Sequence, residues 1–361
     1  MTEGQDVRLV ALRIGTGVPT RPFAGVVRSV FANAAILTVA DGLVTLVPAA
    51  TGGLPGAITV DVPLGFDFAS FVAVGAEAAS RAGILRFAGG AASIDLRAAR
   101  PWTSGLRDIS LDFGDPATDS AWRNVAAALR ADGRSDAIAR LARQDILSLS
   151  AATRHFDLES AERAAVRLVG LGAGGTPAGD DLLVGYLAGL WSSAAGVCIR
   201  ADFAAGLGKA LLGLAKRTND VSRVYLAAAA AGEASERLAA VAARIAAGAA
   251  PTALAEAAAA AVAVGHTSGA DGALGLLLGL AALGTGDDLQ GKQAARRRDA
   301  SASRRLEPEK RTAERAALRT RDARRSGRRG DQVRYVYFFS SLALMAAEPI
   351  DATPPSRMPT T

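Results

Sequence analysis

The sequence contains little of what metal centres and disulfide scaffolds need. Its 361 residues include one cysteine, Cys198, and two histidines, His155 and His266. A single cysteine excludes a disulfide framework and any multi-cysteine zinc or iron–sulfur site, and two histidines exclude a three-histidine metal centre. Aromatic residues make up only 5% of the chain, and alanine, glycine and leucine are abundant. For Cys198 we expect a place in the core.

Positive charge is concentrated in one segment. The net charge is +6, yet residues 286–335 alone hold 16 Lys and Arg against 8 Asp and Glu. The rest of the chain is therefore slightly acidic, which argues against a nucleic-acid-binding protein. Arginine clusters in this segment have the charge to grip phosphates, but without interleaved aromatics we favour a solvated tail. Residues 286–361 are predicted to be a basic, low-complexity, disordered tail.

No membrane or secretory segment is expected. The first 15 residues are broken by charged side chains and lack a long apolar region. Leu182 to Ile199 carries no charge for 18 residues but contains three glycines and two serines and follows an aspartate pair. A buried core helix explains this composition better than a membrane span. The protein is therefore predicted to be cytoplasmic.

Residues 1–112 are predicted to form a small β-rich domain. Short apolar runs alternate with turn signals, and Asp41-Gly42 between two such runs favours a hairpin. The expected strands are Gly25–Phe31, Ala35–Val39, Leu43–Val47, Ala57–Val62, Ile84–Phe87 and Ser93–Leu96. This half reads as a small sheet or barrel and shows no catalytic constellation.

Residues 113–285 are predicted to form a mainly α-helical domain. Apolar residues recur at helical spacing, and Asp115, Ser135, Asp157 and Asp220 are plausible caps. The expected helices are Asp115–Arg130, Ser135–Leu149, Asp157–Val169, Asp180–Ser192, Phe203–Leu214, Asp220–Ala231, Ala234–Ala247, Thr252–Val264 and Ala273–Leu283. The fold class is thus α+β, with two glycine-rich loops at helix N-termini, Gly170–Gly179 and Gly265–Gly272.

The densest chemical signal is the glycine-rich run that ends in an aspartate pair. Gly172, Gly174, Gly175 and Gly179 let the backbone approach a ligand, Thr176 adds a hydroxyl, and the following helix points its free N–H groups at the loop. Asp180 and Asp181 would repel an anion there. Either the carboxylates hold a cation such as Mg²⁺ or polarise an amine or amide, or one of them caps the helix. A tight structural turn is the plain alternative.

Two further segments repeat this combination of polar groups. Gly265–Gly272 offers His266, Thr267, Ser268, Gly269 and Asp271 before an apolar helix, and His266 is a candidate acid or base. A histidine bonded within a turn is the commoner case. Thr218 and Ser222 share a face if a helix begins there, although a cap by Asn219 or Asp220 explains that segment equally well. Two loops of this form could converge on one pocket.

These three segments together resemble a known family. The pattern Gly-x-Gly-x-Gly-x-Thr-Pro-x-Gly-Asp-Asp, then Thr-x-x-x-Ser, then Gly-His-x-Ser-Gly-x-Asp is similar to the AllH-like subunit of oxamate carbamoyltransferase. Val26–Phe31 also resembles the start of that family. Gly175 stands where a leucine-like residue is usual, and Ala178 stands where serine is usual. The resemblance covers about residues 20–285.

The resemblance implies a carbamoyltransferase subunit in purine (allantoin) catabolism, where oxalurate and phosphate give oxamate and carbamoyl phosphate. It implies partner subunits, one of them similar to acyl-CoA synthetases, and a small anionic substrate such as carbamoyl phosphate, phosphate or a carboxylate. The predicted catalytic residues are Asp180, Asp181, His266 and Asp271. The predicted anion-binding residues are Gly172, Gly174, Gly175, Thr176, Gly179, Thr218, Ser222, Thr267, Ser268 and Gly269. The rival hypothesis is a non-catalytic ligand-binding or assembly subunit.

The first prediction concerns the basic tail. Because large apolar residues are scarce after residue 285, deletion of residues 286–361 should leave the melting temperature of the remaining chain within a few degrees of the full chain. Thermal unfolding followed by circular dichroism measures this. A large drop would show that the tail packs on the core. Any weak DNA binding should disappear with the tail and fall steeply with added salt.

Overall fold

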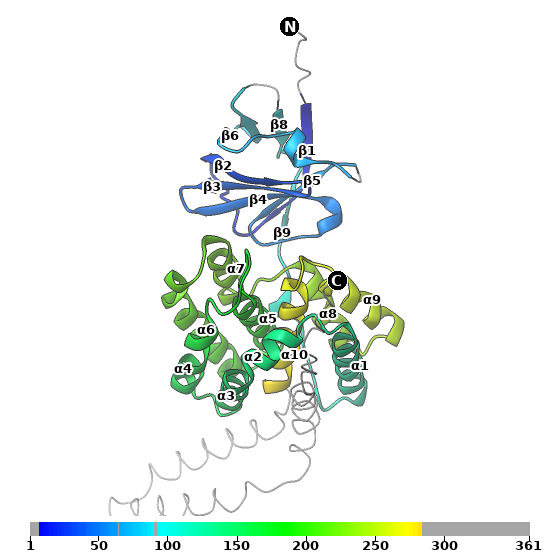
Figure 1. Cartoon of the computed structure of the whole chain (residues 1–361). Helices are drawn as coiled ribbons and strands as arrows, with labels where there is room; N and C mark the ends of the chain where they lie inside the picture. Colours follow the sequence, from blue (N-terminus) through cyan, green and yellow to red (C-terminus); the bar gives the residue numbers. More distant parts are fainter. Residues whose placement is uncertain (1–6, 64, 90–91, 284–361) are drawn as a thin grey trace, which may run out of the picture.

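The computed structural model describes residues 7–63, 65–89 and 92–283. Over these residues nine strands come first and ten α-helices follow, which confirms the predicted α+β class (Figure 1). The strands are β1 Val7–Gly15, β2 Ala24–Phe31, β3 Ala34–Val39, β4 Gly42–Pro48, β5 Ala57–Asp61, β6 Glu77–Arg81, β7 Ile84–Phe87, β8 Ala92–Asp95 and β9 Arg100–Trp102. The predicted basic, low-complexity, disordered tail, residues 286–361, lies outside the described residues.

The strands form one sheet that closes on itself. Its order is β5-β4-β3-β2-β6-β7-β8-β1-β9, and β5 also pairs with β1. The β1–β5 pairing is antiparallel, whereas β1 runs parallel to both β8 and β9. Closure leaves no free edge among the eight strands of the ring, and β9 adds a short edge beside β1.

The predicted hairpin at Asp41-Gly42 is confirmed. Strands β3 and β4 are antiparallel with Val39 opposite Gly42, and Gly42 has a φ of 138°. All six expected strands are present within one or two residues. Strands β1, β6 and β9 were not predicted, because β6 carries small and charged residues, β9 contains Pro101, and the apolar pattern of β1 is interrupted by arginines.

The inner face of the closed sheet is a hydrophobic cluster of its own. Leu37, Ile58, Leu85 and Ile94 are fully buried in it. Edge-to-face aromatic contacts continue the cluster at one end, for example between Phe66 and Phe68 at 5.1 Å between ring centroids. Burial alternates along β3 and β7, as a half-buried sheet requires, whereas β4 and β5 have consecutive buried residues and are covered on both faces.

The helices that follow bury a second, larger cluster. The α-helices are α1 Pro116–Asp132, α2 Asp136–Leu141, α3 Arg143–Arg154, α4 Leu158–Leu168, α5 Ala178–Ser192, α6 Cys198–Gly213, α7 Asp220–Ala230, α8 Glu236–Ala246, α9 Pro251–Val262 and α10 Ser268–Leu283. Short 3-10 turns occupy Ala49–Thr51, Phe68–Ser70, Leu106–Asp108 and Ala215–Arg217. Because Leu106 already packs in the helical cluster, the clusters separate before it, and the domain boundary at residue 112 stays a prediction.

The predicted caps and helix bounds need five corrections. Asp115 and Asp157 cap α1 and α4 as predicted, but Ser135 makes no capping hydrogen bond, and Asn219 rather than Asp220 caps α7. The single helix predicted over residues 135–149 is two helices, α2 and α3. Helix α6 begins at Cys198, which is exposed rather than in the core. Helix α10 begins at Ser268, five residues before the predicted start.

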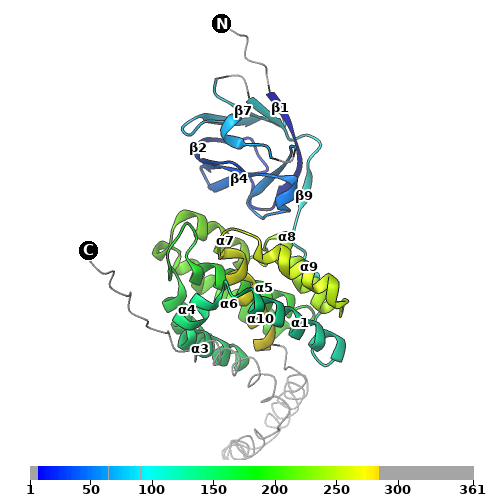
Figure 2. The same ribbon diagram turned by 45° about the vertical axis from the view of Figure 1, so that its right-hand side comes forward.

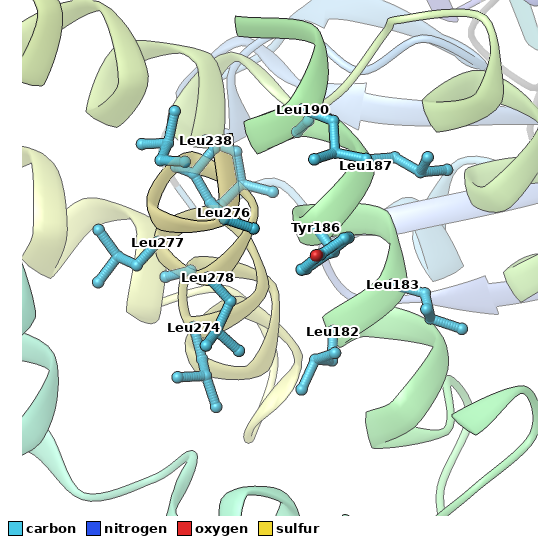
Figure 3. Packing of buried hydrophobic residues seen from close by; sticks show 14 of the residues in the cluster. Leu182, Leu183, Tyr186, Leu187, Leu190, Leu238, Leu274, Leu276, Leu277 and Leu278 are labelled. Atoms are coloured by element: carbon cyan, nitrogen blue, oxygen red, sulfur yellow. The ribbon is translucent and has the colours of Figure 1, made fainter. Parts of the chain in front are cut away.

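Helices α5 and α10 lie side by side at the centre of the helical region. A Cβ added at Gly185 would overlap the backbone carbonyl of Gly272, and one added at Gly275 would overlap that of Leu182. Gly279 meets the backbone of Tyr186 in the same way. From the pair Leu182 and Gly275 to the pair Tyr186 and Gly279, the residue numbers increase along both helices, so the helices run parallel. Figure 3 shows the leucines and Tyr186 that surround this backbone contact. Only glycine allows so close an approach.

The sheet contacts the helical region through β4 and α7 and through ion pairs (Figure 2). Arg13 donates to Glu236 at 2.9 Å, and Arg28 donates to Asp220 at 2.6 Å. The carboxylate of Glu236 also accepts the N–H of Gly53. These ion pairs accompany an apolar contact, because residues of β4, β5 and α7, among them Leu43 and Val224, line one small cavity.

None of the described helices combines the length and apolarity that a membrane crossing needs. The uncharged stretch from Leu182 to Ile199 is divided, since α5 ends at Ser192 and α6 starts at Cys198. Leu182, Leu187 and Leu190 are fully buried. The interpretation of this stretch as a core helix is confirmed for its first part.

The α5–α10 contact can be tested with one methyl group. Gly185→Ala should lower the free energy of unfolding by roughly 1–3 kcal/mol, because the added Cβ overpacks the helix contact. The matched control is Gly213→Ala on α6, where nothing lies within 4 Å of the added Cβ. This control should be neutral or stabilising by up to about 1 kcal/mol. Urea titrations of both variants measure the difference, and equal effects would contradict the close contact.

Candidate functional site

The segment between α4 and α5 is an open loop with unused backbone donors. Gly172 and Gly174 have φ values of 104° and 112°, in the left-handed region that favours glycine. Residues 172–175 are exposed. Within the described part of the chain, none of the hydrogen bonds uses a backbone N–H of residues 172–176 as donor. These N–H groups are therefore available to an acceptor.

Asp180 holds this loop in place from inside. Its carboxylate accepts the N–H of Gly170 at 2.8 Å and the hydroxyl of Thr218, and the residue is 1% exposed. The Asn219 side-chain amide donates to the carbonyl of Gly175 at 2.9 Å. The connection between α6 and α7 thus clamps both ends of the loop. The alternative that an aspartate caps α5 is wrong, because the N-cap is Pro177, which makes no side-chain bond.

Asp181, one residue further, lies where the two helix N-termini meet. Thr176 donates its hydroxyl to the carboxylate of Asp181 at 2.9 Å. The same hydroxyl oxygen lies 2.8 Å from that of Ser268, the first residue of α10. Since α5 and α10 run parallel, both positive dipole ends point toward this spot. The segments before α5 and α10 therefore converge.

The second carboxyl group comes from α10. Asp271 is 1% exposed, and its Oδ2 has no hydrogen-bond partner among the described residues. Burial raises the pKa of Asp271 to about 6, although a hydrogen bond from Thr267 opposes the shift. Burial also raises the pKa of Asp181 to about 7, with further increases from the charges of Asp271 and Asp180, against the hydrogen bonds of Ser268 and Thr176. Two carboxyl groups therefore titrate near neutral pH.

Several predicted site residues lie elsewhere than expected. Gly269 and Asp271 belong to α10, so most of the segment 265–272 is helix rather than loop. Added Cβ atoms at Gly179 and Gly269 would overlap the carbonyls of Leu168 and Ala261, so these glycines permit backbone packing. Their N–H groups already donate to backbone carbonyls. His266 is exposed, and none of the hydrogen bonds of the Thr176–Asp181–Ser268 cluster involves it.

Sequence analysis missed Tyr225 of α7, whose phenol interacts electrostatically with Asp181. Burial and the charge of Asp181 raise the pKa of its phenol. Tyr225 also lines a cavity of about 10 Å³, space for about one water, together with Val221, Val224 and residues of the sheet. Ser222, three residues earlier on the same helix, is buried with a hydroxyl that has no partner among the described residues. The spacing of three residues was a signal that could have linked the two.

The described residues form no ready-made metal site. Across them, no three His, Cys, Asp or Glu side chains gather as a metal-binding group. Both oxygens of the Asp180 carboxylate already accept hydrogen bonds, from Gly170 and Thr218. The hypothesis of Mg²⁺ at Asp180 and Asp181 therefore stays a prediction.

Comparison with protein families gives one match. The model of the family described as oxamate carbamoyltransferase subunit AllH matches residues 168–280. This range begins at the end of α4 and includes the loop, α5, α7 and most of α10. The resemblance found in the sequence is therefore confirmed over that range. No curated protein and no solved structure matches the chain.

The raised pKa values predict how stability depends on pH. Asp271 has a pKa of about 6 in the folded chain against an ordinary value of 3.8, so the folded state binds its proton more tightly than the unfolded state. The stabilisation that the folded state gains from this tighter proton binding is fully present below pH 4, and it is lost as the pH rises through about 6. Asp271→Asn removes the titration. The melting temperature of the variant, relative to the wild type, should therefore rise between pH 4 and pH 7.

Over this pH range, the free energy of unfolding of Asp271→Asn should rise relative to that of the wild type by about 2–3 kcal/mol at most. Asp181→Asn gives a second measurement, in which the relative gain should continue up to about pH 7, where the pKa of Asp181 lies. Differential scanning calorimetry at closely spaced pH values measures both curves. A difference from the wild type that is constant over this range would contradict the two buried titrations.

Proposed function

We propose that this chain is a subunit of a carbamoyltransferase that moves a carbamoyl group between phosphate and a small amide or carboxylate substrate. The observation that carries the proposal is that Thr176, at the end of the loop with unused N–H groups, donates its hydroxyl to Asp181, a buried carboxyl group that interacts electrostatically with Asp271. The match of residues 168–280 to the oxamate carbamoyltransferase subunit family supports the same reaction class.

The loop is the proposed anion-binding half of the site. Backbone N–H groups of Gly174, Gly175 and Thr176 would donate to a phosphate or carboxylate, and the parallel α5 and α10 would add their positive dipole ends. No side-chain cation is needed for this first contact. The glycines matter because Gly172, Gly174 and Gly175 are exposed and have no Cβ to cover their backbone.

The carboxyl pair is the proposed proton-transfer half. When carbamoyl phosphate is the donor, the acceptor nitrogen attacks the carbamoyl carbon, a C–N bond forms and the C–O bond to phosphate breaks. The nitrogen loses a proton, which Asp181 accepts as a carboxylate and returns to the departing phosphate. In the reverse direction protonated Asp181 donates to the leaving nitrogen. A pKa of about 7 suits both directions near neutral pH.

The remaining polar residues orient these groups. Thr176 and Ser268 fix the Asp181 carboxyl by the hydrogen bonds described above. Asp271, whose buried Oδ2 has no hydrogen-bond partner among the described residues, would accept from an amide N–H of the substrate. His266 stays a candidate proton carrier to solvent, since it is exposed and directly precedes Thr267. Thr218 and Ser222 act through the loop clamp and through α7.

Partner subunits, among them one similar to acyl-CoA synthetases, belong to this proposal, as do a place in purine (allantoin) catabolism and a cytoplasmic location. The rival function, a non-catalytic ligand-binding or assembly subunit, would use the same loop. It predicts anion binding without any effect of Asp181 on turnover.

The experiment is carbamoyl exchange by the assembled complex. Labelled carbamoyl phosphate and an amide acceptor are incubated with the full chain and its partner subunits, and label in the ureido product is counted. Asp181→Asn, which is nearly isosteric, should reduce exchange at least tenfold, about 1.4 kcal/mol in the transition state. Phosphate binding by this variant should change much less.

The loop is tested by Gly175→Val. Nothing lies within 4 Å of a Cβ added at Gly175, and its φ is not positive, so folding should be unaffected while the side chain obstructs the loop N–H groups. Gly213→Val, in similarly open space on α6, is the matched control and should exchange normally. A complex that binds phosphate yet exchanges no carbamoyl group with any ureido or amide substrate would favour the binding-subunit function.

A further inference from the structure

Three charged side chains form a cluster where the sheet meets the helical region. Arg28 of β2 donates to Asp220 of α7 at 2.6 Å, and Arg223 pairs with the other oxygen of the same carboxylate. The side chains of Arg28, Asp220 and Arg223 are 42%, 40% and 43% exposed. Two guanidinium groups share one carboxylate, so the cluster carries one surplus positive charge that no described side chain neutralises.

This charged cluster lies beside the loop. Asp220 directly follows Asn219, whose amide donates to the carbonyl of Gly175 at 2.9 Å. Asn219 also caps α7 by accepting the N–H of Ser222. The adjacent residues Asn219 and Asp220 therefore hold the loop and the two arginine side chains, respectively. Arg28 reaches this place from a different part of the chain, outside the range that matches the family model.

We propose that Arg28, with Arg223, binds the second negative charge of a dianionic ligand held at the loop, and so selects phosphate-type dianions over monocarboxylates. This inference rests on the proposed anion site. In the free protein Asp220 occupies the two guanidinium groups, and the ligand oxygen takes its place. An ion pair as exposed as this one costs little to open, and guanidinium forks match phosphate oxygens well.

The second ion pair between sheet and helices differs in a useful way. Glu236 accepts from both Arg13 and the N–H of Gly53. Those bonds tie the sheet to α8 rather than to the α6–α7 connection that holds the loop. Arg13 is therefore a matched control for Arg28, since either change removes one ion pair between the same two parts of the chain.

The test is titration calorimetry of the full chain with inorganic phosphate, carbamoyl phosphate and oxamate. Arg28→Gln should weaken binding of the two phosphate ligands about tenfold or more, because a charged hydrogen bond is lost, and should change oxamate binding less than threefold. Asp220→Asn should tighten phosphate binding, since the competing carboxylate is gone. Arg13→Gln should leave all three affinities as in the wild type.

Arg28→Lys keeps the positive charge but lacks the paired N–H donors of the guanidinium group. It should therefore bind phosphate more tightly than Arg28→Gln and less tightly than the wild type. Equal effects of Arg28→Gln and Arg13→Gln, or weaker phosphate binding by Asp220→Asn, would overturn the inference. Phosphate binding that depends on Gly175 but not on Arg28 would overturn it while leaving the proposed function intact. Binding that depends on Arg28 in a complex without carbamoyl exchange would keep the inference and remove the proposed function.

Discussion

The close contact between α5 and α10 is the constraint on which the candidate site depends. Glycines on both helices, such as Gly185 and Gly275, bring the two backbones together, and the parallel direction places both N-termini at one end. Without that contact the hydroxyls of Thr176 and Ser268 would not meet at 2.8 Å. A pair of antiparallel helices would put opposite dipole ends at the site, so direction matters as much as distance.

The same contact explains why the carboxyl groups titrate high. Asp271 lies within the first turn and a half of a helix whose other residues are almost all buried, so its carboxyl group is buried with them. An unpaired charge in that position is costly, and the proton is retained instead. The glycine packing that builds the core thus also sets the proton affinity of the site. Stability and proposed chemistry share one cause.

Sequence alone was sufficient for features whose signal is local. The Asp41-Gly42 hairpin, the caps at Asp115 and Asp157 and the strong strands depend on neighbouring residues. The start of α10 was misplaced because glycines at 269 and 272 are typical of a loop, whereas the structure uses Gly269 to pass close to α9. Arg28 could not be assigned and Tyr225 was not, since their partners Asp220 and Asp181 come from distant segments. Only the tertiary fold brings these together.

Four aspartates near helix N-termini show how one residue type has different roles. The carboxylate of Asp180 accepts hydrogen bonds from Gly170 and Thr218, so its role is structural. Asp181 and Asp271 are buried, and their raised pKa values reduce the negative charge that an arriving anion would meet. Asp220 is exposed and already offset by two arginines. The apparent conflict between an anion-binding loop and an aspartate pair disappears once each carboxyl group is placed.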